Sequence, residues 1–144
     1  MLLTRLLYTS QATRALELTA VRELNDLAQA KNRADGITGL LGYNDPFFVQ
    51  CLEGPRSVVS RTMERIYRDP RHSAITLIEF AEVKERVFGD WGMKLVLPGD
   101  MAPGEFRRVC ELYGGVPFSP SRMTVGNALR FLLELAPGPV RVLG

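Results

Sequence analysis

A glutamine in the middle of an apolar segment is the residue of this chain whose type most suggests chemistry. Gln50 lies in FFVQCL, within residues 36–55, which read as two apolar strands joined by a tight turn. A buried carboxamide costs free energy unless its donors and its acceptor find partners. Gln50 is therefore expected either at a sheet edge that faces water or in contact with a polar group in the interior. Tyr8, in the apolar segment RLLYTS, is the candidate for that second polar group.

The segments that must position these side chains alternate between strand and helix. The Asn44-Asp45-Pro46 cluster predicts a hairpin turn, and Asp69-Pro70 ends a helix. The order β-α-β-β-α-β-β is that of an α+β ferredoxin-like sandwich with one extra strand, in which a five-stranded mixed sheet carries both helices on one face. Strands are predicted at residues 2–9, 37–43, 46–53, 74–83 and 91–97, with helices at 15–31 and 56–68.

The chain changes character after residue 97, where proline-glycine pairs interrupt it. Two more helices are predicted at about 104–113 and 124–136, the second rich in leucine. A large bare apolar face is uncommon in a monomer, so we expect these helices to cover the other face of the sheet or to share it with a partner chain. Residues 98–144 are therefore interpreted as a helical extension of the same compact unit as residues 1–97.

The overall composition excludes several classes of protein. A chain of 144 residues, 46% hydrophobic and 24% charged, is typical of one globular domain, and a net charge of +2 does not favour binding to nucleic acid or to an acidic membrane. Cys51 and Cys110 lack the spacing of a zinc site or a disulfide framework, so reduced thiols in the cytoplasm are expected. The N-terminal segment lacks the features of a signal peptide, and no apolar run approaches the ~18–20 residues that a membrane span needs.

Six short segments, in the same order along the chain, resemble the BLUF family of flavin-binding blue-light sensors. The resemblance covers residues 2–97, and the two-helix tail resembles that of short family members with no fused effector domain. No single segment is specific, but six in order are. The segments are RLLYTS at 5–10, Asn32, GITGLLGY at 36–43, FFVQCLEGP at 47–55, RIYRDPRH at 65–72 and RVFGDWGM at 86–93.

The resemblance implies that FAD, or alternatively FMN, is held non-covalently between the two helices. It implies that Tyr8 and Gln50 lie beside the edge of the isoalloxazine ring. Asn32 matches the position whose carboxamide bonds the polar pyrimidine edge of the ring. Ile37 and Ile66 would supply apolar walls.

Further cofactor contacts are implied at the end of the second helix. Arg71 and His72 match positions that approach the ring or the ribityl chain. Asp69 orients that turn or meets a ribityl hydroxyl. Arg65 and Lys31 are candidates for the ring oxygens, the phosphates or the rim of the pocket.

The residue types suit the photochemistry that the resemblance implies. A phenol can give an electron and then a proton, and a neutral amide offers donors and an acceptor from one planar head. Light would move an electron and a proton from Tyr8 through Gln50, and their return would leave Gln50 rotated or tautomerised. The flavin would then be a chromophore rather than the cofactor of an enzyme.

The resemblance also implies a route for the signal. Trp91 and Met93 are two residues apart, so both are expected on one face of the last strand, and the family pattern places one or the other beside Gln50. We hypothesise that their exchange, or a shift of that strand, reports to the tail helices. Because no cyclase, phosphodiesterase or DNA-binding domain is recognised, the output is expected to reach a separate protein or to change self-association.

Ordinary explanations exist for each residue taken alone. Tyr8 alone is typical of a packed strand residue, Asn32 of a helix cap, and His72 of a surface loop, since one histidine makes no metal site. Two other functions stay open. One is an enzyme on this scaffold, such as an acyl phosphate hydrolase or a small oxidoreductase, although no Ser-His-Asp, HExxH or GxxxxGK pattern is recognised. The other is an interaction module that binds no flavin.

Overall fold

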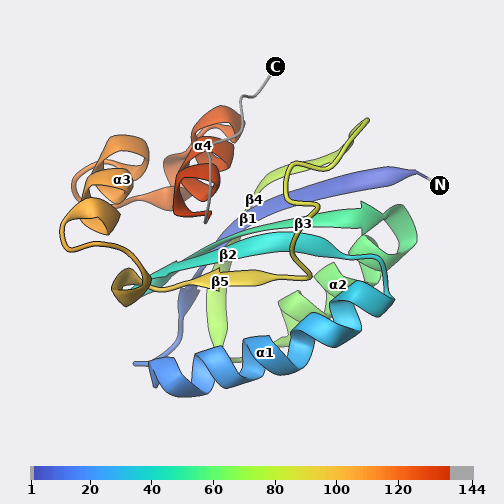
Figure 1. The fold of residues 1–144 in the computed structure, drawn as a ribbon, viewed down its shortest axis with the longest axis horizontal. Coiled ribbons are helices and arrows are strands. Elements are labelled where there is room, and N and C mark those ends of the chain that lie inside the picture. Colours follow the sequence, from blue (N-terminus) through green and yellow to red (C-terminus); the bar gives the residue numbers. More distant parts are fainter. Residues whose placement is uncertain (1, 137–144) are drawn as a thin grey trace.

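A five-stranded sheet forms the middle layer of the protein (Figure 1), seen in a computed structural model that describes residues 2–136. The strands lie in the order β4-β1-β3-β2-β5; all neighbours are antiparallel except β2 and β5, which are parallel. This confirms the predicted α+β fold with a mixed sheet. The strands are β1 (Leu3–Ala12), β2 (Thr38–Asn44), β3 (Phe47–Pro55), β4 (His72–Glu82) and β5 (Lys94–Val96).

Two helices cover each face of this sheet. Helices α1 (Leu18–Ala34) and α2 (Arg56–Arg68) lie on one side, and α3 (Glu105–Gly114) and α4 (Val125–Leu135) lie on the other (Figure 1). The bounds of α2 agree with the prediction, while α1 is displaced by three residues toward the C-terminus. No helix within residues 2–136 is long and apolar enough to cross a membrane.

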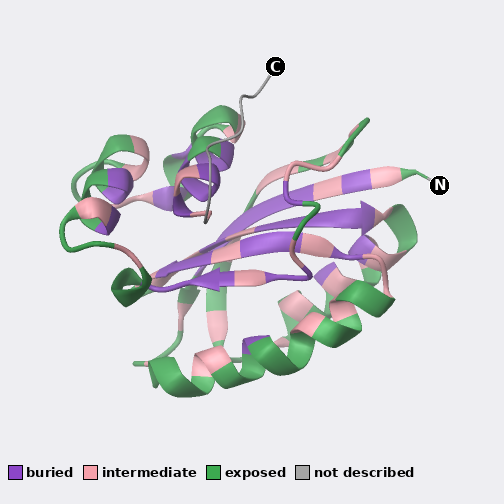
Figure 2. Ribbon diagram, in the orientation of Figure 1, coloured by how far each residue is buried: buried purple, intermediate pink, exposed green. Residues whose placement is uncertain are grey.

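The larger hydrophobic core lies between the sheet and α4. Figure 2 shows the buried residues concentrated in the central strands and on the inner side of α4. Helix α4 packs on β2 and β3 and is contacted on its other side by α3. The helix lies close to the sheet at Gly42, where a Cβ atom would lie 2.8 Å from Leu135 Cδ1. The predicted covering of this sheet face by the tail helices is thus confirmed; residues 137–144 of the predicted extension lie outside the described residues.

Helix α1 is packed less closely than its leucine spacing predicts. Leu24 and Leu27 are 48% and 78% exposed, and Asn25 is the buried residue of this helix, which the structure describes in full. Of the apolar stripe expected along α1, Val21 packs against the core cluster of Tyr43, Leu95 and Leu97, whereas Leu24 and Leu27 do not enter a core. Leu24 borders a cavity beneath the helix, and Leu27 faces solvent.

The last strand differs from its prediction. Residues 91–93 precede β5 and are not part of it, so the alternation of a strand does not apply to them. Met93 is buried with Tyr8 and Ile37 on the α1/α2 side, whereas Trp91 packs against the core on the α4 side. The prediction that Trp91 and Met93 share one face was wrong for this reason.

A buried carboxylate anchors the loop that leads to Met93. Glu53 is fully buried in β3 and accepts hydrogen bonds from the backbone N–H groups of Val87 and Phe88 at 2.9 and 2.7 Å. Arg86, the preceding residue, donates to the carbonyl oxygens of Gly36 and Glu53 at 2.8 and 2.9 Å. The loop is thereby held against the end of β3 and the start of β2.

Replacing Gly39 by alanine tests how closely this region is packed. A Cβ atom at Gly39 would lie 2.0 Å from the carbonyl oxygen of Cys51 and 2.9 Å from Met93 Cε. Overpacking costs roughly 1–3 kcal/mol, and a backbone neighbour cannot turn away, so we expect Gly39→Ala to lower the free energy of unfolding by about 3 kcal/mol in urea denaturation.

Gly99→Ala is the matched control for this substitution. Among the described residues, apart from its chain neighbours, no atom lies within 4 Å of its added Cβ position, so the change should stay within about 0.5 kcal/mol. Equal stability of the two variants would contradict the close packing at Gly39.

Candidate functional site

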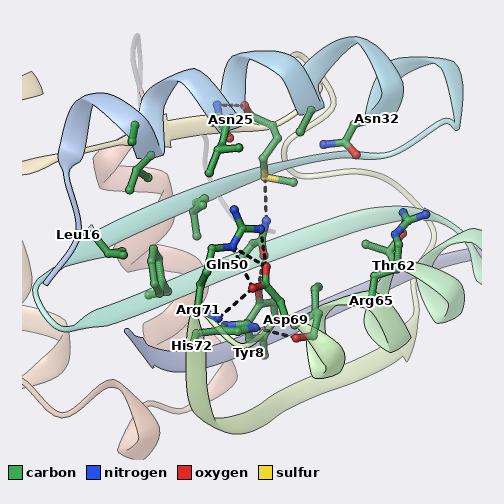
Figure 3. Close-up of a pocket in the computed structure, with 18 of the residues that line it drawn as sticks. Tyr8, Leu16, Asn25, Asn32, Gln50, Thr62, Arg65, Asp69, Arg71 and His72 are labelled. Carbon is green, nitrogen blue, oxygen red and sulfur yellow. Dashed lines mark hydrogen bonds and ion pairs between the residues drawn. The ribbon is translucent and has the colours of Figure 1, made fainter. Parts of the chain in front are cut away.

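A cavity of about 500 Å³ lies between α1 and α2 above the sheet (Figure 3). This volume is within the range of about 300–1,000 Å³ that small-molecule and cofactor sites occupy. Most of the wall is apolar, and a few polar side chains project into it. The apolar wall is formed by Leu16, Val21, Leu24, Ala28, Leu41, Phe48 and Ile66.

Tyr8 and Gln50 form the floor of the cavity. They are directly opposite each other in the β1–β3 register, so their side chains are neighbours on one face of the sheet. Tyr8 Oη donates a hydrogen bond to Gln50 Oε1, and Gln50 Nε2 lies 3.3 Å from Met93 Sδ.

Met93 determines the orientation of this carboxamide. A thioether sulfur has no proton to give, so the amide nitrogen of Gln50 must face it, and the amide oxygen is left for Tyr8. Burial, together with the negative charge of Asp69, raises the pKa of Tyr8 well above its ordinary value. The phenol therefore keeps its proton on Oη and acts as the donor.

Asn32 presents a second carboxamide at the far end of the cavity (Figure 3). It lies in the last turn of α1, where its backbone oxygen accepts from Ile37 N at 2.8 Å. Within residues 2–136 its side chain has no hydrogen-bond partner. Its donors and its acceptor are therefore free for a bound molecule.

Charged side chains gather where α2 ends. Arg71 Nε lies 2.9 Å from Asp69 Oδ1, and this guanidinium lowers the pKa of Asp69. Arg65, on the last turn of α2, donates to Thr62 Oγ1 at 3.3 Å. Arg65 and Arg71 are exposed, so the rim of the cavity carries positive charge that solvent can reach.

His72 lies against the cavity with both ring nitrogens paired inside the protein. Nε2 is 2.7 Å from the carbonyl oxygen of Ile66, and Nδ1 is 2.8 Å from Ser10 Oγ. Because a carbonyl only accepts, Nε2 carries the proton and Nδ1 accepts from the serine hydroxyl. The ring therefore ties the end of α2 to β1 and meets Tyr8 edge-on, with ring centroids 6.4 Å apart.

Three of the residues expected at the site lie elsewhere. Lys31 is exposed and forms an ion pair with Asp35 at 3.2 Å. Ile37 is buried in the core beneath the cavity rather than in its wall. Trp91 packs on the opposite side of the sheet.

Two residues that the sequence analysis did not select contact the site from α1. Asn25 Nδ2 and Gln29 Nε2 donate to the carbonyl oxygen of Met93 at 3.1 and 2.9 Å. With Asn32 they lie at spacings of four and three residues, so the three amides share one helical face. A run of amides interrupting the apolar spacing of this helix was the signal available in the sequence.

Comparison with known proteins shows the family to which this chain is similar. The family described as sensors of blue-light using FAD matches residues 3–94. Photoactivated adenylate cyclase subunit beta of Euglena gracilis is 39% identical over 90 residues, which cover 62% of this chain and 10% of that protein. The blue light- and temperature-regulated antirepressor BluF of Escherichia coli (strain K12) is 33% identical over 94 residues, which cover 65% of this chain and 23% of the antirepressor. The chain thus spans about a tenth of the length of the cyclase relatives.

Solved structures extend the similarity to the tail. The structure titled BlsA photo-activated state superimposes with a TM-score of 0.80 and 31% identity, covering 98% of this chain and 99% of that one. A bacterial light-regulated adenylyl cyclase superimposes with a TM-score of 0.73 and 26% identity over 80% of this chain and 34% of that one.

The cavity fits the cofactor that this family binds. FAD carries a flat tricyclic ring with one polar edge, and the site offers an apolar slot between two helices with free amide groups at Asn32 and a carboxamide–phenol pair on its floor. Arginines at the rim suit the phosphates. The chain belongs to the BLUF family of flavin-binding blue-light sensors.

Proposed function

We propose that the light response of this chain starts at the contact between Tyr8, Gln50 and Met93. The observation that carries this proposal is the position of one carboxamide between a phenol that donates and a sulfur that accepts. Because both ends of the Gln50 carboxamide are paired, a lasting change at this side chain requires an exchange of its hydrogen-bond partners. The chain would thus be a photosensor without substrate turnover.

FAD held by these residues would supply the absorption of blue light and an excited state that can take an electron. Tyr8 is the buried phenol that gives this electron, and its proton leaves Oη for Gln50 Oε1 along the existing hydrogen bond. Both the electron and the proton return to Tyr8, so the cycle leaves no residue oxidised. What persists is a rotated or tautomerised Gln50.

The two end states differ at Met93. Rotation turns Gln50 Oε1 toward Met93 Sδ, so two acceptors face each other and the contact is lost. The tautomer keeps a proton on nitrogen and can keep the contact. A displaced Met93 therefore favours rotation.

We propose that the signal leaves the site through β5 and reaches the helices of the C-terminal extension. Met93 immediately precedes β5, and Val96 of β5 is paired with Gly42 of β2. A Cβ atom at Gly42 would lie 2.8 Å from Leu135 Cδ1 of α4, which supports a short route from Gln50 to α4. Trp91, packed on the α4 side, would report the same movement from the other face.

The receiver is proposed to be a separate protein or a second copy of this chain. Residues 98–136 would act as an output extension of the sensor unit, since α4 is packed on its sheet. Two free, buried cysteines support a reducing compartment such as the cytoplasm, and burial raises the pKa of Cys110 to about 11. Chromatography of the released pigment would distinguish FAD from FMN.

Gln50→Leu should abolish the light response while the protein still binds flavin. Leucine fills a similar volume but cannot bond Tyr8, so the protein should stay yellow and show no red shift in a light-minus-dark absorbance spectrum. Tyr8→Phe should behave alike because its ring has no hydroxyl proton. Gln11→Leu, at an exposed glutamine of β1, should respond as the wild type does, and a normal shift in Gln50→Leu would refute the proposal.

Met93→Ala should separate the optical response from the output. The variant should keep its red-shifted absorbance and lose the light-dependent change in hydrogen exchange of α3 and α4. Because removal of a buried methionine side chain also costs about 2–5 kcal/mol, Met93→Leu serves as the volume-matched variant that lacks only the sulfur. Exchange in α4 that responds to light normally in both variants would rule out this route.

A further inference from the structure

Two side chains of α1 converge on one backbone atom beside the photochemical site. The carbonyl oxygen of Met93 accepts from Asn25 Nδ2 at 3.1 Å and from Gln29 Nε2 at 2.9 Å. A carbonyl oxygen has two lone pairs, so both are used. The two amides are one helical turn apart and point the same way. Asn25 is also the buried residue of α1.

Steric contacts also hold residues 92–93 against α1. A Cβ atom at Gly92 would lie 2.9 Å from the backbone oxygen of Gln29 and 2.7 Å from Arg33 Cγ. Below, a Cβ atom at Gly39 would lie 2.9 Å from Met93 Cε. Residues 92–93 therefore fill the space between β2 and α1, and Met93 cannot shift without a response in the helix.

Helix α1 also binds the other end of β5. Arg22 Nη2 lies 2.7 and 2.8 Å from the two oxygens of Asp100, and Asp100 Oδ2 accepts from Leu97 N at 2.9 Å. This ion pair is partly exposed and adds little stability, but it connects α1 to the turn where the C-terminal extension begins. Helix α1 thus contacts the chain on both sides of β5, at Met93 before the strand and at Asp100 after it.

We propose that Asn25 and Gln29 are positioning residues that hold Met93 against Gln50 in the dark and make α1 a second output element beside α4. The inference rests on the proposed function, because it requires the Gln50–Met93 contact to change in the light. The side chain of Met93 receives the change at Sδ, and its carbonyl oxygen passes the change to α1.

Loss of one donor has a defined consequence. With a single amide on its carbonyl, Met93 is held less firmly. The free-energy difference that favours the dark pairing of Gln50 over the light-adapted pairing then becomes smaller. Recovery in the dark should slow by about fivefold, which corresponds to one net hydrogen bond. The size of the red shift should not change, because Tyr8 and Gln50 keep their own contact.

The test uses the flavin-loaded full chain and two replacements of the half-buried Gln29. Gln29→Met keeps the length of the side chain and removes the donor, whereas Gln29→Lys keeps a donor. Gln11→Met, at an exposed glutamine, is the matched control. The readouts are the dark-recovery rate after blue light and hydrogen exchange of residues 18–34 and 93–96 in darkness and in light.

We expect Gln29→Met to recover about fivefold more slowly, to exchange faster at 93–96 in the dark and to lose the light-dependent change in α1. Gln29→Lys and Gln11→Met should resemble the wild type. Asn25→Leu repeats the test from the other donor. Wild-type recovery and exchange in Gln29→Met, or equal behaviour of Gln29→Met and Gln29→Lys, would overturn the inference.

The dark exchange at 93–96 separates this inference from the proposed function. A wild-type protein with no red shift would refute the proposed photochemistry, whereas faster dark exchange in Gln29→Met would still establish the hold on Met93. A normal red shift together with unchanged dark exchange would refute only the role of Gln29.

Discussion

The carboxamide of Gln50 has a donor end and an acceptor end, and of its two hydrogen-bond neighbours within residues 2–136 only Met93 distinguishes them. The hydroxyl of Tyr8 can donate or accept, but the sulfur of Met93 can only accept. The sulfur of Met93 therefore favours one orientation of the amide, which the tyrosine by itself leaves open. The contacts that hold Met93 in place thus also favour this pairing of Gln50.

Strand β3 contributes to this constraint from both of its faces. One face carries Gln50 into the cavity, and the other carries the buried carboxylate of Glu53, three residues later. Glu53 and Arg86 fix the loop that delivers Met93 to the site. A buried carboxylate costs free energy unless it is paired, and here the backbone N–H groups of the loop pair it. Strand β3 therefore positions both Gln50 and the loop that brings Met93 to it.

Helix α1 gives up close packing to form the site. A helix inserted into a core would bury its leucines, but Leu24 borders the cavity and Leu27 faces solvent. Beside the apolar contact of Val21, α1 uses amides on the carbonyl of Met93 and an ion pair with Asp100. Polar contacts of this kind depend on geometry more steeply than apolar ones do, which suits the role proposed for α1 in responding to a small displacement of Met93.

The sequence by itself determined the order of the elements, the bounds of α2 and the family, because these depend on local propensity, apolar period and short motifs. It also indicated Tyr8, Gln50, Asn32 and the polar end of α2 as side chains for one site. Only the tertiary structure decided which face Trp91 and Met93 take, since three residues outside a strand follow no alternation. It likewise decided that Lys31 and Ile37 lie outside the cavity wall and that Asn25 and Gln29 meet Met93. Those contacts join residues more than sixty positions apart, and no local pattern encodes the distance between a helix and a loop packed against it.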